Sequence, residues 1–178
     1  MKLIFNSLFP ILLFFSCESS LPNDKSDLNQ DRSSGDYWVI SQYGVGAIKT
    51  NMPITQIPKG LTVKNDGGGT SQMYLIYNDK NEQVLSIVSD TMDNLIDGIF
   101  ISESKLPKTS TGVSIGSSFG DLKKEFKDLN AFGDWMTGKG VLQSKKVFFE
   151  TDFEWEKTAL PKAIIPEDAK ITKIWILD

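Results

Sequence analysis

The chain has 178 residues, a formal net charge of −4, no histidine and a single cysteine. The lack of histidine excludes Ser-His-Asp and Cys-His catalysis and an imidazole metal site, and one cysteine cannot form a redox pair, a cysteine zinc site or an internal disulfide. The length suits one domain or two very small ones, and 40% hydrophobic residues are typical of a globular protein. The acidic balance argues against a nucleic-acid partner.

Residues 1–16 have the composition of a secretory signal peptide. The basic start Met1-Lys2 precedes an almost wholly apolar stretch, residues 3–15. As a helix this stretch would rise about 20 Å, which is too short for a bilayer core of roughly 30 Å but suits the apolar region of a signal.

Cys17 directly follows this stretch and the small residue Ser16. Here the sequence resembles bacterial lipoproteins, whose lipobox ends in a small residue and Cys, although Phe14-Phe15 departs from the commoner Leu-Ala type. The resemblance implies cleavage before Cys17, its lipidation, and stable anchoring in the cell envelope. In enteric bacteria an Asp after the Cys resembles an inner-membrane retention signal, so Glu18 favours the outer membrane. An ordinary signal peptide and a buried N-terminal helix are the alternatives.

Residues 18–36 are rich in Ser, Asp and Asn and contain no aromatic residue. Such a segment buries too little to offset its chain entropy, so with Cys17 it predicts a lipidated tether over 17–36 with a reach of roughly 25 Å. Its acids lack the Gly and closing Glu of a calcium loop, and we expect no metal there. The folded domain is expected over residues 37–178, beginning with a strand at Tyr37–Ile40.

Parts of the domain recur along the chain. The three matches pair residues 48–57 with 113–122, residues 71–79 with 144–152, and residues 96–101 with 171–176, at offsets of 65, 73 and 75. They predict an α+β fold of two degenerate repeats, about 44–103 and 109–178. Each repeat is expected to contain a short helix and antiparallel strands, and the strands of both are expected to form one mostly antiparallel sheet. Chance similarity between apolar strands is the alternative.

The clearest helix signal lies in the second repeat. Ser118 stands three residues before Asp121, a capping-box spacing. The apolar residues that follow have helical spacing: Phe119, Leu122, Phe126 and Leu129. We therefore expect a helix over 118–129, packed on one face of the sheet. In the first repeat Pro58 and Gly60 leave room for about one turn.

Segments rich in β-branched and aromatic residues predict the strands. They are residues 73–78, 83–88 and 95–102 in the first repeat, and 146–150, 171–177 and, with a weaker pattern, 153–157 in the second. Asp79–Glu82 is expected to be the turn of a hairpin.

A second resemblance is carried by Gly112-Val113-Ser114-Ile115-Gly116-Ser117-Ser118 and Asp121-Leu122. This pattern resembles the module of the beta-lactamase inhibitor protein, and small outer-membrane-assembly lipoproteins carry a similar one. In the first repeat Asn51 replaces the Gly and Met52-Pro53 replaces the Ser pair. The resemblance implies a helix-plus-sheet module used for protein contact, and it transfers no catalytic residue.

The segment Gly133–Gly140 approaches a phosphate-binding loop but lacks the Ser/Thr after the Lys and the helix behind it. We interpret it as a loop between helix and sheet, and expect no nucleotide.

Four acids alternate with apolar residues or Thr near the end of the chain: Glu150, Asp152, Glu154 and Glu156. In one continuous strand they would line one face at steps of about 6.6 Å, which suits a basic partner, a cation or a carboxylate pair of glycosidase type. The second internal match instead places residues 151–152 over a turn, which would divide the acids. A solvated face or turn is the plainest interpretation.

The four tryptophans divide into two pairs. Trp38 and Trp175 lie in apolar runs and are expected in the core. Trp135, in a Gly-bounded loop, and Trp155, between two Glu residues, are candidates for contact with a protein or a sugar. Partial coverage of the core is the alternative for both.

Taken together, the sequence predicts a lipid-anchored lipoprotein of the cell envelope, non-catalytic and without cofactor or metal, whose domain binds a protein partner or assists assembly. The alternative is a small-ligand or glycan binder that uses Trp135 and Trp155, and a carboxylate-only envelope hydrolase is the least favoured class. Two converging buried carboxylates would favour the hydrolase, a broad apolar patch the protein-binding module, and a deep aromatic-walled pocket the ligand binder.

Overall fold

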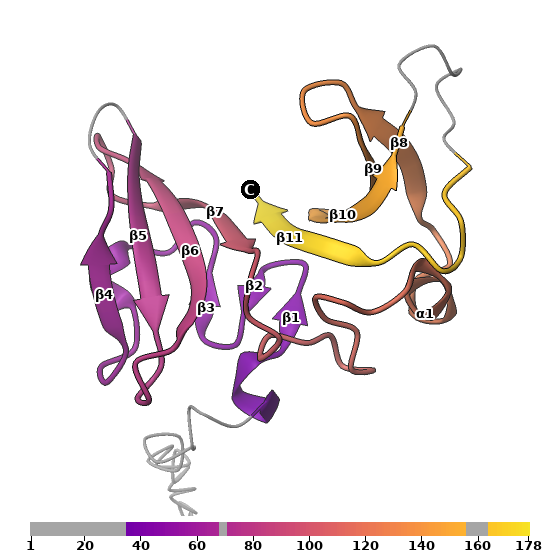
Figure 1. Cartoon of the computed structure of the whole chain (residues 1–178). Helices are drawn as coiled ribbons and strands as arrows, with labels where there is room; N and C mark the ends of the chain where they lie inside the picture. Colours follow the sequence, from indigo (N-terminus) through magenta and orange to yellow (C-terminus); the bar gives the residue numbers. More distant parts are fainter. Residues whose placement is uncertain (1–34, 68–70, 156–163) are drawn as a thin grey trace, which may run out of the picture. The chain divides into compact units, whose positions relative to one another are not determined.

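An eight-stranded antiparallel sheet with the order β4-β5-β6-β7-β11-β10-β9-β8 dominates the described residues (Figure 1). A computed structural model describes residues 35–67, 71–155 and 164–178. The strands are β4 (Thr62–Asn65), β5 (Ser71–Tyr77), β6 (Gln83–Asp90), β7 (Ile96–Ile101), β8 (Asn130–Asp134), β9 (Lys139–Ser144), β10 (Val147–Glu154) and β11 (Ile171–Leu177). The predicted signal peptide, Cys17 and the tether as far as residue 34 lie outside the described residues.

The sheet consists of two four-stranded meanders that meet through their last strands. β4 to β7 pair in chain order, and so do β8 to β11. β7 and β11 then pair antiparallel, from Ile101 opposite Ile174 to Gly98 opposite Leu177. In Figure 1 these two strands occupy the middle of the sheet, with β4–β6 on one side and β8–β10 on the other.

Each meander binds the segment that precedes it through an equivalent backbone hydrogen bond. The amide of Asn51 donates to the carbonyl of Ile96 at 2.8 Å, and the amide of Gly116 donates to the carbonyl of Ile171, also at 2.8 Å. The donors are 65 positions apart and the acceptors 75, which are the offsets of the first and third sequence matches. Asn51 and Gly116 also share a positive φ, of 63° and 86°, a conformation that Gly and Asn tolerate best.

The second sequence match does not align equivalent strands of the two meanders. Residues 71–79 cover β5 and the start of its turn, whereas residues 144–152 begin at the last residue of β9 and lie mostly in β10. The second strands of the two meanders are β5 and β9, and the turns that follow them differ in length. Five residues separate β5 from β6, whereas only Lys145 and Lys146 separate β9 from β10.

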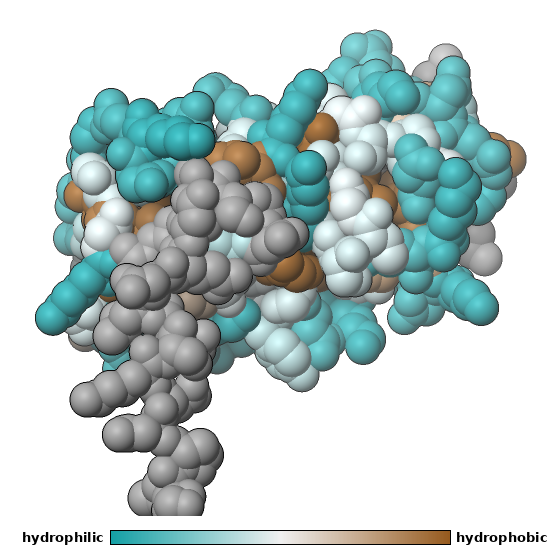
Figure 2. Space-filling model, turned by 90° about the horizontal axis from the view of Figure 1, so that it is seen from below, coloured by the Kyte–Doolittle hydropathy of each residue, from teal (hydrophilic) through white to brown (hydrophobic). Residues whose placement is uncertain are grey.

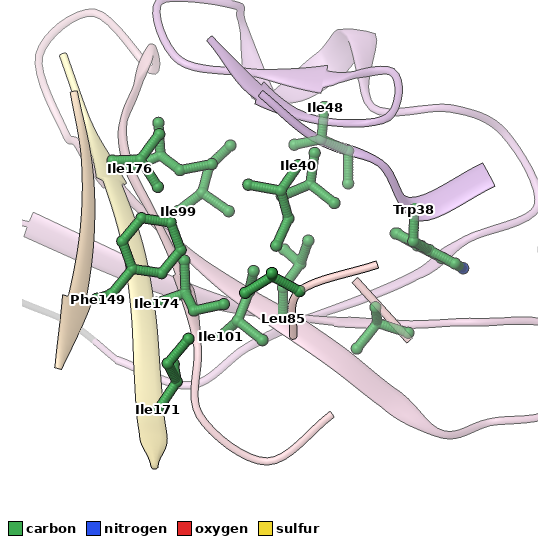
Figure 3. Close-up of a cluster of buried hydrophobic side chains, with 14 of the residues drawn as sticks. Trp38, Ile40, Ile48, Leu85, Ile99, Ile101, Phe149, Ile171, Ile174 and Ile176 are labelled. Carbon is green, nitrogen blue, oxygen red and sulfur yellow. The ribbon is translucent and has the colours of Figure 1, made fainter. Parts of the chain in front are cut away.

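One face of the sheet is covered by small elements that close the core. These are the 3₁₀ helix η2 (Gly35–Trp38), the small sheet β1 (Ile40–Ser41), β2 (Gly44–Val45) and β3 (Ile48–Lys49), the 3₁₀ turn η3 (Ile54–Gln56), and α1 (Phe119–Glu125). Trp38 and Ile48, from these elements, are fully buried together with Ile99, Phe149 and Ile174 of the large sheet (Figure 3). Each such side chain contributes about 1.5–3 kcal/mol when it leaves water.

The start of the domain differs from the predicted strand at Tyr37–Ile40. Residues Gly35–Trp38 form η2, which includes the last two residues of the predicted tether, and only Ile40 enters β1. The Ile40 amide donates to the carbonyl of Lys108 at 2.7 Å, and the Lys108 amide donates to the carbonyl of Trp38 at 3.0 Å. Burial of Trp38 against the core therefore fixes a tight turn where strand propensity alone predicted an extended chain.

Helix α1 begins where predicted but ends early. The capping box at Ser118 and Asp121 is present, with the Asp121 amide donating to Ser118 Oγ at 3.1 Å. The helix ends at Glu125, because Phe126 adopts an extended conformation and its ring packs against Phe149 with centroids 5.6 Å apart. The predicted extension to residue 129 is therefore wrong: residues 126–129 are not helical, and β8 begins at Asn130.

The predicted strands 73–78, 83–88, 95–102 and 171–177 are confirmed as β5, β6, β7 and β11. The segments 146–150 and 153–157 were predicted as separate strands, but residues 147–154 form the single strand β10. The two edge strands, β4 and β8, were not predicted. β4 is short and exposed throughout, and β8 contains Gly133, so neither has a strong strand pattern of its own.

The cap of α1 gives a measurable pH effect. Hydrogen bonds from Ser118 and Lys124 hold the pKa of Asp121 at about 2, below its ordinary value of 3.8. Because the folded-state pKa is depressed, the ionised cap favours the folded state above the ordinary pKa and loses this effect as pH falls from about 4 to 2.

Ser118→Ala should raise the pKa of Asp121 toward 3.8 and lower the free energy of unfolding by about 0.5–2 kcal/mol, because the amide of Asp121 loses its acceptor. NMR titration of the Asp121 carboxyl and urea unfolding would measure the two effects. Ser102→Ala, an exposed site outside the helix, is the control. An unchanged pKa of Asp121 would contradict the assigned cause.

Candidate functional site

The sheet face that points away from the core carries a broad set of apolar side chains. Successive residues of a strand face opposite sides, so Phe148 and Trp175 face away where Phe149 and Ile174 face the core. The same alternation places nine large apolar residues on this face, over six strands. We call them the outer-face band: Met73, Leu75, Tyr77, Val88, Phe100, Phe132, Phe148, Trp175 and Leu177. None of the nine belongs to the core cluster.

Three aromatic rings form the centre of the outer-face band. Phe148 and Trp175 pair across β10 and β11, and their rings stack with centroids 5.7 Å apart and an angle of 8° between planes. Trp175 in turn pairs with Phe100 of β7. A Cβ added to Gly98 would lie only 2.9 Å from the Phe100 ring, so this ring rests on the bare backbone of Gly98. The two meanders thus each contribute to one aromatic cluster.

The band is partly accessible to solvent. Eight of its residues are partly buried, and Met73 is 40% exposed. Near its β4 end, Lys64 places Nζ 4.2 Å from the centroid of the Tyr77 ring. The molecular surface seen from below in Figure 1, by contrast, is mostly hydrophilic with scattered apolar areas (Figure 2). Exposed apolar side chains gathered on one face are typical of an interaction surface.

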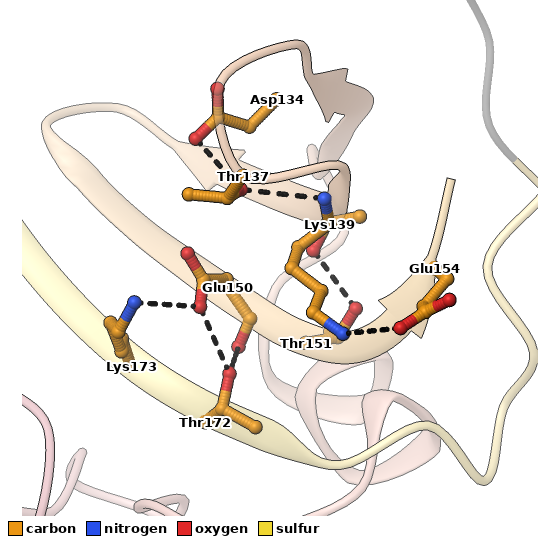
Figure 4. Close-up of polar contacts among 9 residues, drawn as sticks. Asp134, Thr137, Lys139, Glu150, Thr151, Glu154, Thr172 and Lys173 are labelled. Atoms are coloured by element: carbon orange, nitrogen blue, oxygen red, sulfur yellow. Dashed lines mark hydrogen bonds and ion pairs between the residues drawn. The ribbon is translucent and has the colours of Figure 1, made fainter. Parts of the chain in front are cut away.

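The acidic residues of β10 lie on one strand but have separate partners, and Figure 4 shows those of Glu150 and Glu154. Glu150 is 5% exposed and pairs with Lys173 at 3.1 Å, while Glu154 pairs with Lys139 at 3.1 Å. Asp152 accepts the backbone amide of Lys170 at 2.8 Å. Glu156 lies outside the described residues. The alternative of a turn at residues 151–152 is wrong, and the described acids do not converge on a common point.

The tryptophans differ from their predicted roles in two places. Trp38 is in the core as predicted, whereas Trp175, also predicted there, lies on the outer face. Trp155 packs against the core with its indole in the space that a Cβ on Gly133 would occupy. Trp135 is 73% exposed, so it alone of the two candidate contact residues is presented to solvent.

The segment Gly133–Gly140 is a hairpin and not a loop between helix and sheet. Gly133 and Gly140 pair across β8 and β9, and residues 135–138 form the turn. A strand follows where a phosphate-binding loop requires a helix, so the segment has no phosphate-binding geometry.

A cavity of about 350 Å³ opens beside the end of α1 and the β9–β10 turn, with Glu125, Asp128 and Lys145 among its lining residues. The carboxylate of Glu125 accepts hydrogen bonds from the hydroxyls of Thr109, at 2.5 Å, and Thr111. Both of these hydroxyls donate to Oε2, and the hydroxyl of Ser110 donates to Oε1 at 3.4 Å. Phe126 is the one aromatic residue among those that line this cavity, and neither candidate tryptophan lines it.

Within the described residues, no group of three or more acidic side chains is arranged to hold a metal ion. No helix in this part of the chain has the length and apolar character needed to span a bilayer. No family model matches the sequence, and no curated protein and no solved structure matches it either. The resemblances noted in the sequence therefore stay predictions.

Sequence reasoning missed the outer-face band because it assigned apolar runs to the core. One signal for it is present in the sequence. Residues 147–149 and 174–177 are apolar at successive positions, so both faces of β10 and β11 carry apolar side chains. In an antiparallel sheet, one face of such a strand needs a second layer or a partner.

Gly133→Ala tests the placement of Trp155. The added methyl group would overlap the indole and should lower the free energy of unfolding by about 1–3 kcal/mol, as overpacking does. Gly67→Ala is the matched control, because its nearest neighbour is 3.6 Å away, and it should change stability by less than about 0.5 kcal/mol. Equal effects of the two substitutions in thermal or urea unfolding would refute this packing.

Proposed function

We propose that this protein is a lipoprotein of the cell envelope, anchored through Cys17, that binds a partner protein on the outer-face band without catalysis. The observation that carries the binding role is the band itself, with eight large apolar side chains on the five adjacent strands β5, β6, β7, β11 and β10 and a ninth on β8, none in the core. Leaving such an area in water is unfavourable, and burial against a partner removes that cost.

The composition of the band favours a protein partner. Protein interfaces are enriched in Trp, Tyr, Phe and Met at their centre, and the energetic anchors are aromatic residues surrounded by weaker contacts. Trp175, flanked by Phe100 and Phe148, has this arrangement, with the Lys173–Glu150 pair as its charged neighbour. The glycan alternative has less support, because Trp155 is packed against the core. The hydrolase has less support too, because the acids of β10 are separately paired.

We also infer that the domain arose from two degenerate repeats. Support comes from the mirrored strand order and from the shared backbone hydrogen bonds at offsets of 65 and 75. The isolated bridges follow the same two offsets, Pro53 with Leu95 and Ser118 with Lys170. Chance strand similarity would not align these contacts. An experimental structure whose halves did not superpose in this strand order would remove the inference.

The anchor can be tested with one substitution. Cys17→Ala should abolish incorporation of labelled palmitate and release the protein from the membrane fraction, because the acyl chains are attached to this residue. Ser20→Ala, which lies three residues further along the chain, should leave both unchanged. Continued membrane retention of the Cys17→Ala variant would rule out the lipid anchor.

The binding surface can be mapped by site-specific photocross-linking in cells. Benzoylphenylalanine in place of Phe148 should yield a discrete adduct with one envelope protein, because this position is at the centre of the band. The same group in place of Tyr43, which is 59% exposed on the β1–β2 turn, should not. Trp175→Thr should weaken the adduct at position 148 by at least about tenfold, as loss of an aromatic anchor does. Adducts from position 43 alone would place the partner elsewhere.

A further inference from the structure

The turn between β8 and β9 exposes two adjacent large apolar side chains. Trp135 is 73% exposed and Met136 is 75% exposed, both at the tip of the hairpin. This pair is separate from the outer-face band, whose residues lie within strands. It is also not explained by the core, which neither residue joins.

Hydrogen bonds hold this turn in one conformation. The Asp134 carboxylate accepts the amide of Met136 at 2.9 Å and the hydroxyl of Thr137 at 3.0 Å. The amide of Gly138 donates to the carbonyl of Asp134 at 2.7 Å, and Gly138 has a φ of 68°, which suits glycine. The two apolar side chains are therefore presented on a fixed support, which lowers the entropy lost when they bind.

The charges at the turn are already paired or hydrogen-bonded. Lys139, the one basic residue of the segment 134–139, forms an ion pair with Glu154 at 3.1 Å. Asp134 is occupied by the turn itself. The turn thus offers no free cation to an anionic phosphate group, and attraction to acidic lipids does not account for it. An indole with an adjacent thioether suits the boundary between headgroups and acyl chains, where Trp is enriched.

We propose that the β8–β9 turn inserts Trp135 and Met136 into the interface of a zwitterionic lipid bilayer. The proposal deepens the proposed function, since it rests on a domain held near a membrane by its tether. Two apolar side chains bind a bilayer only weakly by themselves, but a tether makes the contact intramolecular and raises its effective concentration. The turn would then orient the domain on the membrane surface.

The test holds the domain on a vesicle surface by an attachment that does not use Cys17. Residues 1–17 are replaced by a hexahistidine tag, which is unique because the chain contains no histidine. The buried hydrophobic residues of the described chain lie between Trp38 and Ile176, so the remaining residues contain the whole described core. The tag holds the protein on phosphatidylcholine vesicles that contain a nickel-chelating lipid, with and without brominated acyl chains.

Emission of Trp135 is obtained as the difference between the protein and its Trp135→Phe variant. We expect brominated lipid to quench this emission by about twofold and the vesicles to protect it from acrylamide, as for an interfacial indole. Met136→Ser should reduce the quenching. Met92→Ser removes a methionine that is 89% exposed on the β6–β7 turn, and it should have no effect.

Equal emission in brominated and ordinary vesicles, with unchanged access to acrylamide, would overturn the proposal. Protection of Trp135 in cell envelopes but not in pure lipid would also overturn it, because the turn would then contact a protein. Since the tag replaces Cys17, neither result depends on lipidation. Failure of the anchor would appear separately, in the fractionation of the Cys17 variant.

Discussion

The ladder between β7 and β11 joins the two meanders, and the rest of the described fold depends on it. It is the ladder that makes one eight-stranded sheet from two four-stranded ones. On one side it brings Ile99 and Ile101 against Ile174 and Ile176, at the centre of the core (Figure 3). On the other side the same register places Phe100 beside Trp175. The pairing of β7 with β11 thus positions both the centre of the core and the centre of the candidate surface.

The two faces differ in what lies over them. The core face is closed by η2, β1–β3, η3 and α1, whose contribution is a small number of buried side chains such as Trp38, Ile48 and Leu122. The opposite face carries the nine apolar residues of the outer-face band, which stay outside the core cluster. A sheet with apolar side chains on both faces is stabilised when a second layer covers each of them.

Sequence patterns predicted those parts of the fold that local interactions determine. The capping box of α1 depends on two residues three apart, and the strands β5, β6, β7 and β11 have apolar or β-branched patterns of their own. The end of α1 was missed because the spacing of Phe126 and Leu129 suits a helix, whereas packing of Phe126 on Phe149 requires an extended chain. The edge strands β4 and β8 are extended because they pair with β5 and β9. Their own sequences have no strong strand pattern from which this could be predicted.

The candidate surface was predicted only in part, for a related reason. Exposure of Trp135 followed from its polar, Gly-bounded surroundings. Trp175 was assigned to the core because it lies between isoleucines, and only the register with β7 and β10 shows which side it faces. The acids of β10 were visible in the sequence, but the lysines that pair with them come from β9 and β11.

Under the proposed function, the division of the aromatic cluster between the two meanders couples recognition to folding. Phe100 belongs to the first meander, and Phe148 and Trp175 belong to the second, so either half folded alone presents an incomplete surface. The contacts of β7 with β11 span more than seventy residues of chain, and such long-range pairings form late because closing the intervening loop costs entropy. A partner that requires all three rings therefore distinguishes the finished protein from its folding intermediates.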